Sequence, residues 1–284
     1  MNWVDEGALY SQISLFLRED LGRGDITSQA ILARNTRARG RFVASETLIV
    51  AGLEAAEEVF LTLDSQQQLE AFVSDGEQVE AGKVIARIAG FADVLLAGER
   101  VALNLIQHLS GIATLTNEFV RAVAGTKTQI VDARESTPGL RMLERYAVVL
   151  GGGNTGRFGL DDGVLITPNH CAMVGSISAA VKDAREKLGH LHKIAVQVGD
   201  ETEVEQAIEH GAEVLILHNV AADIATGLIT RARKLSDGIS IECGGTVVTP
   251  ETAMAFAEAG ADRLAVSTLN CCRPANVTFQ MNPF

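Results

Sequence analysis

The pattern of hydrophobic and polar positions changes partway along the chain. Beyond Thr128, short aliphatic runs alternate with amphipathic stretches, and this rhythm predicts strands at 128–131, 164–166, 193–198, 213–217, 239–241 and 263–266. Strands that alternate with helices predict a parallel sheet joined by right-handed crossovers. Six units in one unbroken series favour a closed barrel over an open doubly wound sheet.

The N-terminal region of the chain mixes helical and strand patterns. It predicts helices at 9–21 and 52–63 and strands at 37–44, 47–51, 69–73 and 84–88, with Asp25 as a possible helix cap. A long helical passage follows at 93–123, and Ser110-Gly111 suggests a break in it. We therefore expect an α+β domain at 1–110, which includes the start of this helix, and an α/β barrel domain at 111–284 that carries the site.

Polar residues follow each of the strands predicted beyond Thr128. In parallel α/β folds the carboxyl ends of the strands meet on one face, where sites are usually built. Solvated loops alone could explain one such pair, but a succession of them favours a site. The residues are Asp132, Arg134, Asn169, His170, Gln197, His218, Asn219, Glu242, Gly244, Gly245, Ser267 and Thr268.

Two glycine runs and several arginines suggest anion binding. Gly151–Gly153 and Gly244-Gly245-Thr246 could each present backbone N–H groups to a phosphate, although either run could equally be a helix cap or a turn. Arg134, Arg141 and Arg157 could recognise a carboxylate or phosphate, while a surface ion pair explains any one of them equally well. Pro138 suits the first turn of the helix that separates these elements.

Composition narrows the class of protein. The net charge of −12 argues against nucleic-acid binding but allows a locally basic site for a small anion. No apolar run approaches the roughly 20 residues that a membrane helix needs, and MNWVDEG does not resemble a signal peptide. The four cysteines show no CxxC spacing, so we expect free thiols and a cytoplasmic location. His170, His218, Asp132 and Glu242 could meet around a metal, but no ligand spacing supports this and we predict no metal site.

Several longer motifs resemble the quinolinate phosphoribosyltransferase family. They are LREDLGRGDITS at 17–28, AGERVALNLIQHLSGIATLT at 97–116, DARESTPGLRMLERYAVVLGGG at 132–153, the Asn-His pair at 169–170 and HGAEVLILHN at 210–219. The resemblance implies an N-terminal open-faced sandwich beside an incomplete α/β barrel. It also implies Mg²⁺, and a homodimer in which Arg100 reaches the partner's site. The implied reaction converts quinolinate and phosphoribosyl pyrophosphate to nicotinate mononucleotide, pyrophosphate and CO₂.

The chain departs from the family pattern within these same motifs. The family's TRKT run is Ala133-Arg134-Glu135-Ser136 here, and its NHR run is Thr155-Gly156-Arg157. Thr167 replaces a lysine, Gln197 a glutamate and His218 an aspartate, and the E-x-S-G run is Glu242-Cys243-Gly244-Gly245. Glu135 repels anions where lysine attracts them, and Gln197 and His218 lack the hard oxygen ligands that Mg²⁺ prefers.

These residues leave three hypotheses open. The first is the family reaction, with Arg100, Arg134 and Arg157 binding anionic groups and Glu242 facing the ribose. The second is an enzyme that acts on another anionic or aromatic ligand without phosphoribosyl pyrophosphate, using His170, His218 and Glu135 as new acid–base or ligand groups. The third is a binding protein that keeps the dimer and has lost its chemistry. Gln197 is a further catalytic-position candidate, and the substrate-contact candidates include Thr167, Asn169, Gly244, Gly245 and Ser267.

Overall fold

The computed structural model describes residues 5–284, which form two compact units. We call residues 5–117, 136–152 and 272–284 the antiparallel unit, and residues 118–135 and 153–271 the parallel unit. The expectation about a signal peptide rests partly on residues 1–4, which lie outside the described residues. Among residues 5–284, no helix combines the length and the apolar character that crossing a membrane requires.

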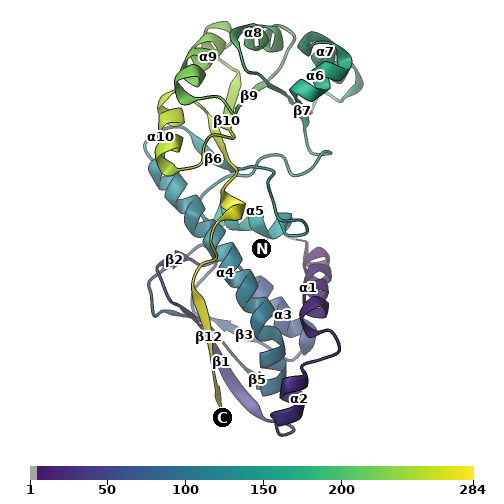
Figure 1. Ribbon diagram of the computed structural model, residues 1–284, viewed down its shortest axis with the longest axis vertical. Coiled ribbons are helices and arrows are strands. Elements are labelled where there is room, and N and C mark those ends of the chain that lie inside the picture. Colours follow the sequence, from purple (N-terminus) through teal and green to yellow (C-terminus); the bar gives the residue numbers. More distant parts are fainter. Residues whose placement is uncertain (1–4) are drawn as a thin grey trace. The chain divides into compact units, whose positions relative to one another are not determined.

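The antiparallel unit is built on a four-stranded sheet in the order β12-β1-β5-β3 (Figure 1). Its elements are α1 (Glu6–Leu21), α2 (Ile26–Ile31), β1 (Arg37–Ala44), β2 (Leu48–Ile49), α3 (Leu53–Leu63), β3 (Leu69–Ala71), β4 (Gln78–Val79), β5 (Val84–Phe91), most of α4 (Ala92–Ala122), α5 (Arg141–Leu150) and β12 (Val277–Pro283). Buried and exposed residues alternate strictly along most of β1, as expected for a strand with one solvated face. The expected cap is confirmed, because the Asp25 carboxylate accepts hydrogen bonds from the N–H groups of Thr27 and Ser28 at the start of α2.

Helix α4 runs without interruption through Ser110 and Gly111, so the expected break is wrong. Both residues serve packing instead. The Ser110 hydroxyl accepts a hydrogen bond from the N–H of Ala51 at 3.0 Å. A Cβ atom on Gly111 would lie 2.6 Å from the carbonyl oxygen of Arg273, so glycine allows the C-terminal segment to pass close to the helix.

Helix α5 begins at Arg141, and Pro138 lies in the turn before it rather than in its first turn. Gly139 has a φ of 88°, which a helix cannot accommodate. At the other end of α5, the N–H groups of Gly151 and Gly152 donate to Ala147 and Val149. The first two residues of the triple glycine therefore end a helix and do not offer their N–H groups to a phosphate.

The carboxylate of Asp75 joins two helices of the antiparallel unit. It accepts hydrogen bonds from the N–H groups of Gly52 and Leu53 at the start of α3 and from the Tyr146 hydroxyl on α5, at 3.0–3.1 Å. Burial raises the pKa of Asp75, while these hydrogen bonds oppose the rise. The three hydrogen bonds compensate for the loss of solvent around this partly buried carboxylate.

The parallel unit contains a six-stranded sheet in the order β6-β11-β10-β9-β8-β7. Its elements are β6 (Gln129–Asp132), β7 (Val164–Ile166), α6 (Pro168–Val174), α7 (Ile177–Lys187), β8 (Ile194–Gln197), α8 (Glu201–Glu209), β9 (Val214–His218), α9 (Ala222–Leu235), β10 (Ser240–Gly244), α10 (Pro250–Glu258), β11 (Arg263–Val266) and the short 3₁₀ helix η1 (Leu269–Cys271). Helices α7 to α10 run along the outside of the sheet (Figure 1) and bury their apolar stripes. The predicted parallel sheet of six strands is confirmed.

The sheet does not close, because β6 and β7 stand at its two edges and are not paired. Asn154 instead forms an isolated parallel bridge with Val131 of β6, donating to the Ile130 carbonyl at 2.8 Å. The returning chain therefore occupies the edge that β7 would need. The incomplete barrel implied by the family resemblance is confirmed, and the closure favoured by periodicity alone is not.

A pair of glycine substitutions tests the packing of α4. We expect Gly111→Ala to destabilise the fold by about 1–3 kcal/mol, because its methyl group would meet backbone atoms of the C-terminal segment. Gly227→Ala is the control, since no atom lies within 4 Å of its Cβ position on α9; it should stabilise the fold by about 0.5–1 kcal/mol. Urea unfolding of both variants provides the measurement, and equal effects would contradict the proposed close approach.

Candidate active site

Parallel strand pairing places several side chains of the parallel unit at one level. Ile216 of β9 pairs with Gln197 of β8 and with Glu242 of β10, and Glu242 pairs with Arg263 of β11. Paired residues on adjacent parallel strands share a face of the sheet. Gln197, Glu242 and Arg263 therefore form a row across three strands, on the face opposite the buried residues that contact the helices.

Glu242 lies in a charged but dry setting. Burial raises the pKa of its carboxyl group, Asp132 raises it further, and the guanidinium of Arg263 opposes both effects. Arg263 is held in place by a 2.6 Å hydrogen bond from its Nη1 to the Ser240 hydroxyl. A carboxyl group whose protonated form is favoured by its surroundings can exchange a proton nearer to neutral pH than an ordinary glutamate.

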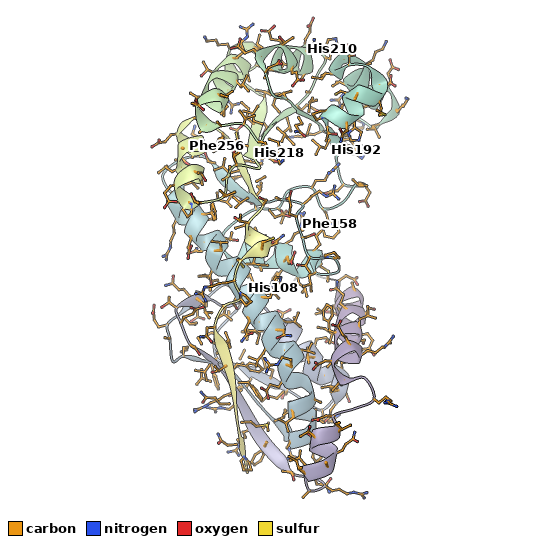
Figure 2. All side chains as sticks on the ribbon, viewed as in Figure 1. His108, Phe158, His192, His210, His218 and Phe256 are labelled. Atoms are coloured by element: carbon orange, nitrogen blue, oxygen red, sulfur yellow. The ribbon has the colours of Figure 1, made fainter. Side chains whose placement is uncertain are left out.

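Strands β9 and β10 end in a tight backbone arrangement around His218 and Gly244, which pair with each other. Asn219 has a φ of 59°, and its N–H donates to the Gly244 carbonyl at 3.0 Å. A Cβ atom on Gly245 would lie 2.0 Å from Oδ1 of Asn219, so only glycine fits there. Figure 2 labels His218 at the end of β9, where its ring is exposed.

The end of β6 anchors the loop that carries Arg157. Asp132 is almost fully buried, and its Oδ1 accepts a hydrogen bond from the N–H of Gly156 at 2.6 Å. A Cβ atom on Gly156 would lie 3.0 Å from the Asp132 carbonyl oxygen, so the loop approaches β6 closely. The loop is therefore fixed beside the strand that leads directly into Arg134.

The guanidinium groups of Arg134 and Arg157 lie close enough to repel each other. Burial lowers the pKa of Arg157, the charge of Arg134 lowers it further, and Asp162 opposes the change. Nη1 of Arg157 donates to the Gly163 carbonyl at 3.0 Å. Its Nε is buried and has no hydrogen-bond partner among the described residues. Two adjacent cations with a buried unused donor are a suitable arrangement for a small anion.

Glu135 and Asn270 are linked through the backbone. The amide of Asn270, in η1, donates to the carbonyl of Glu135 at 2.8 Å, and Asn270 is buried. This contact connects the segment after β6 to the turn that follows β11. The side chains of Arg134 and Glu135 remain exposed. The negatively charged Glu135 is thus held next to the positively charged Arg134, and both side chains are open to solvent.

The candidates at the end of β7 serve mainly to begin a helix. Nδ1 of His170 accepts the N–H of Thr167 at 3.1 Å and contacts the Thr167 hydroxyl at 2.7 Å, so the two residues form a capping box for α6. Asn169 is exposed in the first turn of this helix. Nε2 of His170 is left for a ligand, but Nδ1 is not.

Arg100, like Arg141, belongs to the antiparallel unit, whereas Arg134, Arg157 and the candidates at the strand ends belong to the parallel unit. It is exposed on α4, on the same helical face as Asn104. The third member of that face, His108, donates through Nε2 to the buried carboxylate of Glu144 at 2.9 Å. A cavity of about 440 Å³ lies against Asn104, His108 and Phe16.

Two residues near the site were missed by sequence reasoning. Arg263 opens a strand and was counted only as a member of it, although its charge faces Glu242. Asn270 stands beside the cysteines and belongs to no recognisable motif.

Ser267 is half-buried after β11, and the hydroxyl of the neighbouring Thr268 is buried without a partner among the described residues. Cys243, in contrast, is an unsuitable nucleophile, because burial raises the pKa of its thiol to about 12.

The residues present do not form a Mg²⁺ site of their own. Within residues 5–284, no group of three or more His, Cys, Asp or Glu side chains is placed to share an ion. Mg²⁺ prefers hard oxygen ligands, and Gln197 and His218 offer an amide and an imidazole instead of carboxylates. Asp132 and Glu242 are the nearby carboxylates, and Asp132 already binds the Gly156 N–H. We therefore assign no step to a metal.

The fold and the site together define an incomplete α/β-barrel protein with charged residues at the strand ends. Comparison with known proteins gives the family. Residues 112–277 match the sequence profile described as quinolinate phosphoribosyl transferase, C-terminal domain, and residues 25–110 match that of the N-terminal domain. The chain belongs to the quinolinate phosphoribosyltransferase family.

Individual relatives extend over most of the chain. A probable nicotinate-nucleotide pyrophosphorylase (carboxylating) of Synechocystis sp. is 40% identical over 89% of this chain and 85% of its own length. The corresponding probable enzyme of Bacillus subtilis is 41% identical over 89% and 86%. The solved structure of the nicotinate-nucleotide pyrophosphorylase from Francisella tularensis superposes with a TM-score of 0.92, at 31% identity and with coverage of 99% and 98%.

The raised pKa of Glu242 predicts how stability depends on pH. A carboxyl group with a raised folded-state pKa costs stability once both states are ionised, and this cost disappears below its unfolded-state pKa. Glu242→Gln should therefore stabilise the fold by about 0.5–2 kcal/mol near pH 7. Below about pH 4 the gain should vanish. Urea unfolding at both pH values tests this, with the exposed Glu258→Gln as the control. A gain that is equal at both pH values would contradict the assignment.

Proposed function

We propose that this chain is a quinolinate phosphoribosyltransferase-like protein that binds a small anion at the strand ends of its parallel unit and performs the family reaction with altered chemistry. The observation that carries the anion site is the adjacent pair Arg134 and Arg157, with the buried, unpartnered Nε of Arg157. Like charges held together cost free energy, and a bound carboxylate or phosphate relieves that cost.

The family reaction joins quinolinate to the ribose carbon of phosphoribosyl pyrophosphate and releases pyrophosphate and CO₂. On our proposal, Arg134 and Arg157 bind the acidic groups of the substrates. The carboxylate of Glu242 faces the positive charge that develops at the ribose carbon, and Arg263 opposes the rise in the pKa of Glu242 that burial causes. Each role follows from the charge and place of a residue at the strand ends.

Three residues support altered chemistry. Glu135 repels an incoming anion, and Gln197 and His218 cannot supply negative charge near the ribose. A single lost electrostatic contact to a transition state costs about 3–4 kcal/mol in measured cases, a factor of roughly 10²–10³ in rate. Losses at several contacts do not simply add, but turnover at the ordinary rate of the family is hard to sustain.

We extend the proposal to a homodimer in which Arg100 of one protomer completes the site of its partner. Arg100 and Asn104 are exposed on α4, and Asn104 lines the 440 Å³ cavity together with Glu19 and Asp20. An exposed arginine beside such a hollow suits a contact with a second subunit. Sedimentation of the purified protein tests the dimer, and a monomer at micromolar concentration would exclude it.

A second candidate function is an enzyme or binding protein for another anionic or aromatic ligand. It is favoured by the exposed position of His218 at the end of β9, where the imidazole offers its nitrogen atoms to a ligand. This candidate keeps the arginine pair and dispenses with phosphoribosyl pyrophosphate.

The deciding experiment is a turnover assay with quinolinate, phosphoribosyl pyrophosphate and Mg²⁺ that follows nicotinate mononucleotide. We expect product formation to be at least about 100-fold slower than in an ordinary family enzyme assayed in parallel. Product at the ordinary rate would contradict altered chemistry. Binding of quinolinate without any product would support the second candidate.

Loss of one arginine should weaken anion binding. We expect Arg157→Gln to weaken binding of quinolinate about 10- to 100-fold, because a charge-assisted hydrogen bond to a partly buried donor is removed. Arg231→Gln is the matched control, since Arg231 forms an exposed ion pair with Glu205 on the outer helices. Titration calorimetry measures both, and equal affinities of the two variants would argue against the arginine pair as the anion site.

Restoring a single family residue should not restore ordinary turnover. Glu135→Lys returns positive charge beside Arg134, so the Michaelis constant for the anionic substrate should fall. The rate constant should stay low, because Gln197 and His218 still lack the family's acids. Steady-state kinetics separate the two effects, and recovery of full turnover by this one change would overturn the account.

A further inference from the structure

A second concentration of positive charge lies on the solvated face of the antiparallel sheet. Arg37, Arg39 and Arg41 occupy alternate positions of β1, and all three are exposed. Arg87 of β5 pairs directly with Arg41 across the strands. We call these four residues the arginine face. They belong to the antiparallel unit and are not among the candidates for the family reaction.

The described residues supply no ion-pair partner to the arginine face. Glu70 of β3 pairs with Arg87 in the sheet register, yet no ion pair joins any of the four guanidinium groups to a carboxylate in residues 5–284. By contrast, arginines on the outer helices of the parallel unit, such as Arg231 and Arg233, do form ion pairs. Like charges directly opposite each other on neighbouring strands are destabilising. Four neighbouring arginines without an ion-pair partner in residues 5–284, in a chain of net charge −12, therefore indicate that this face binds an external anion.

Aromatic rings hold these guanidinium groups in place. Arg39 lies 4.2 Å above the ring of Phe284, and Arg87 lies 4.9 Å above that of Phe72. Arg37 lies over Phe91 at 5.3 Å. Stacking fixes the plane of a guanidinium while leaving its N–H edge available, so less side-chain entropy is lost when it binds a phosphate.

The face is also concave and carries amide groups. A groove of about 790 Å³ is lined by Arg39, Arg41 and Arg87, by the side-chain amides of Gln68, Gln280 and Asn282, and by one carboxylate, that of Glu70. Gln280 already accepts a hydrogen bond from Nε of Arg41 at 2.9 Å, which orients both side chains. Guanidinium groups bind phosphate oxygens in pairs of parallel hydrogen bonds, and amides offer both a donor and an acceptor to a base or ribose.

We propose that this groove binds a nucleoside triphosphate, with the phosphates on Arg39, Arg41 and Arg87 and the nucleoside on the amides. The volume of the groove lies within the roughly 300–1,000 Å³ usual for small-molecule sites. A long nucleic acid fits less well, because the net charge of −12 repels a polyanion that extends beyond the groove. The site is independent of the proposed reaction, since it shares no residue with it.

Calorimetric titration with ATP, inorganic triphosphate and a short single-stranded oligonucleotide tests the proposal. We expect saturable binding of ATP at one site per chain, weaker binding of inorganic triphosphate, and loss of affinity when NaCl rises from about 0.05 M to about 0.25 M. Absence of saturable ATP binding at millimolar concentration would overturn the proposal. Equal affinity for inorganic triphosphate would remove the nucleoside from it, and tighter binding of the oligonucleotide would replace it with a nucleic-acid surface.

Variants locate the binding. The double substitution Arg41→Gln/Arg87→Gln should weaken ATP binding by about tenfold or more, because two charge-assisted contacts are lost. Arg18→Gln, an exposed change on α1, should leave it unchanged. Arg157→Gln should also leave it unchanged, whereas loss of ATP binding in that variant alone would place ATP at the strand ends of the parallel unit and refute the second site. Thermal unfolding of each variant confirms that the fold is kept.

Discussion

The hydrogen bond from the Gly156 N–H to the buried carboxylate of Asp132 determines how the sheet of the parallel unit ends and where its charged residues lie. Together with the bridge between Val131 and Asn154, it ties the returning chain to the edge of β6. That edge is thereby closed to β7, so the sheet stays open. The same contact carries Arg157 to the side of Arg134, and Asp132 raises the pKa of Glu242. One buried carboxylate thus links the shape of the sheet to the electrostatics of the site.

The sequence was most informative where periodicity and burial agree. All six parallel strands were predicted, because short aliphatic runs between amphipathic helices are typical of strands buried on both faces. It was least informative where a distant segment decides the outcome. Gly111 looks like a helix break, yet it is there to let residues near Arg273 pass, and β12 pairs with β1 from the far end of the chain. No local sequence pattern indicates either the contact of Gly111 with the C-terminal segment or the pairing of β12 with β1. The predicted domain boundary at residue 110 stays a prediction. The compact units do not follow a single boundary, because residues 136–152 and 272–284 also belong to the antiparallel unit.

For the candidate site, the sequence predicted the positions of several residues in the sheet better than it predicted their contacts. Strand ends identify Gln197, His218 and Glu242, because the carboxyl ends of parallel strands share one side of a sheet. Sequence could not say that Nδ1 of His170 is taken up by a helix cap, or that Arg263 at the start of a strand opposes the charge of Glu242. Such roles depend on rotamers and on cross-strand neighbours.

Positive charge is unevenly distributed over the protein, which the net charge of −12 does not reveal. Arginines on the outer helices are mostly paired with carboxylates, whereas Arg134 and Arg157, and separately Arg41 and Arg87, stand beside another cation. A cation placed beside a cation weakens the fold and is expected to persist only where an anion offsets the repulsion. Each unit on this reasoning holds its own anion site. The net charge of −12 disfavours large polyanions, so small anions that enter a local basic hollow are the ligands that this charge pattern favours.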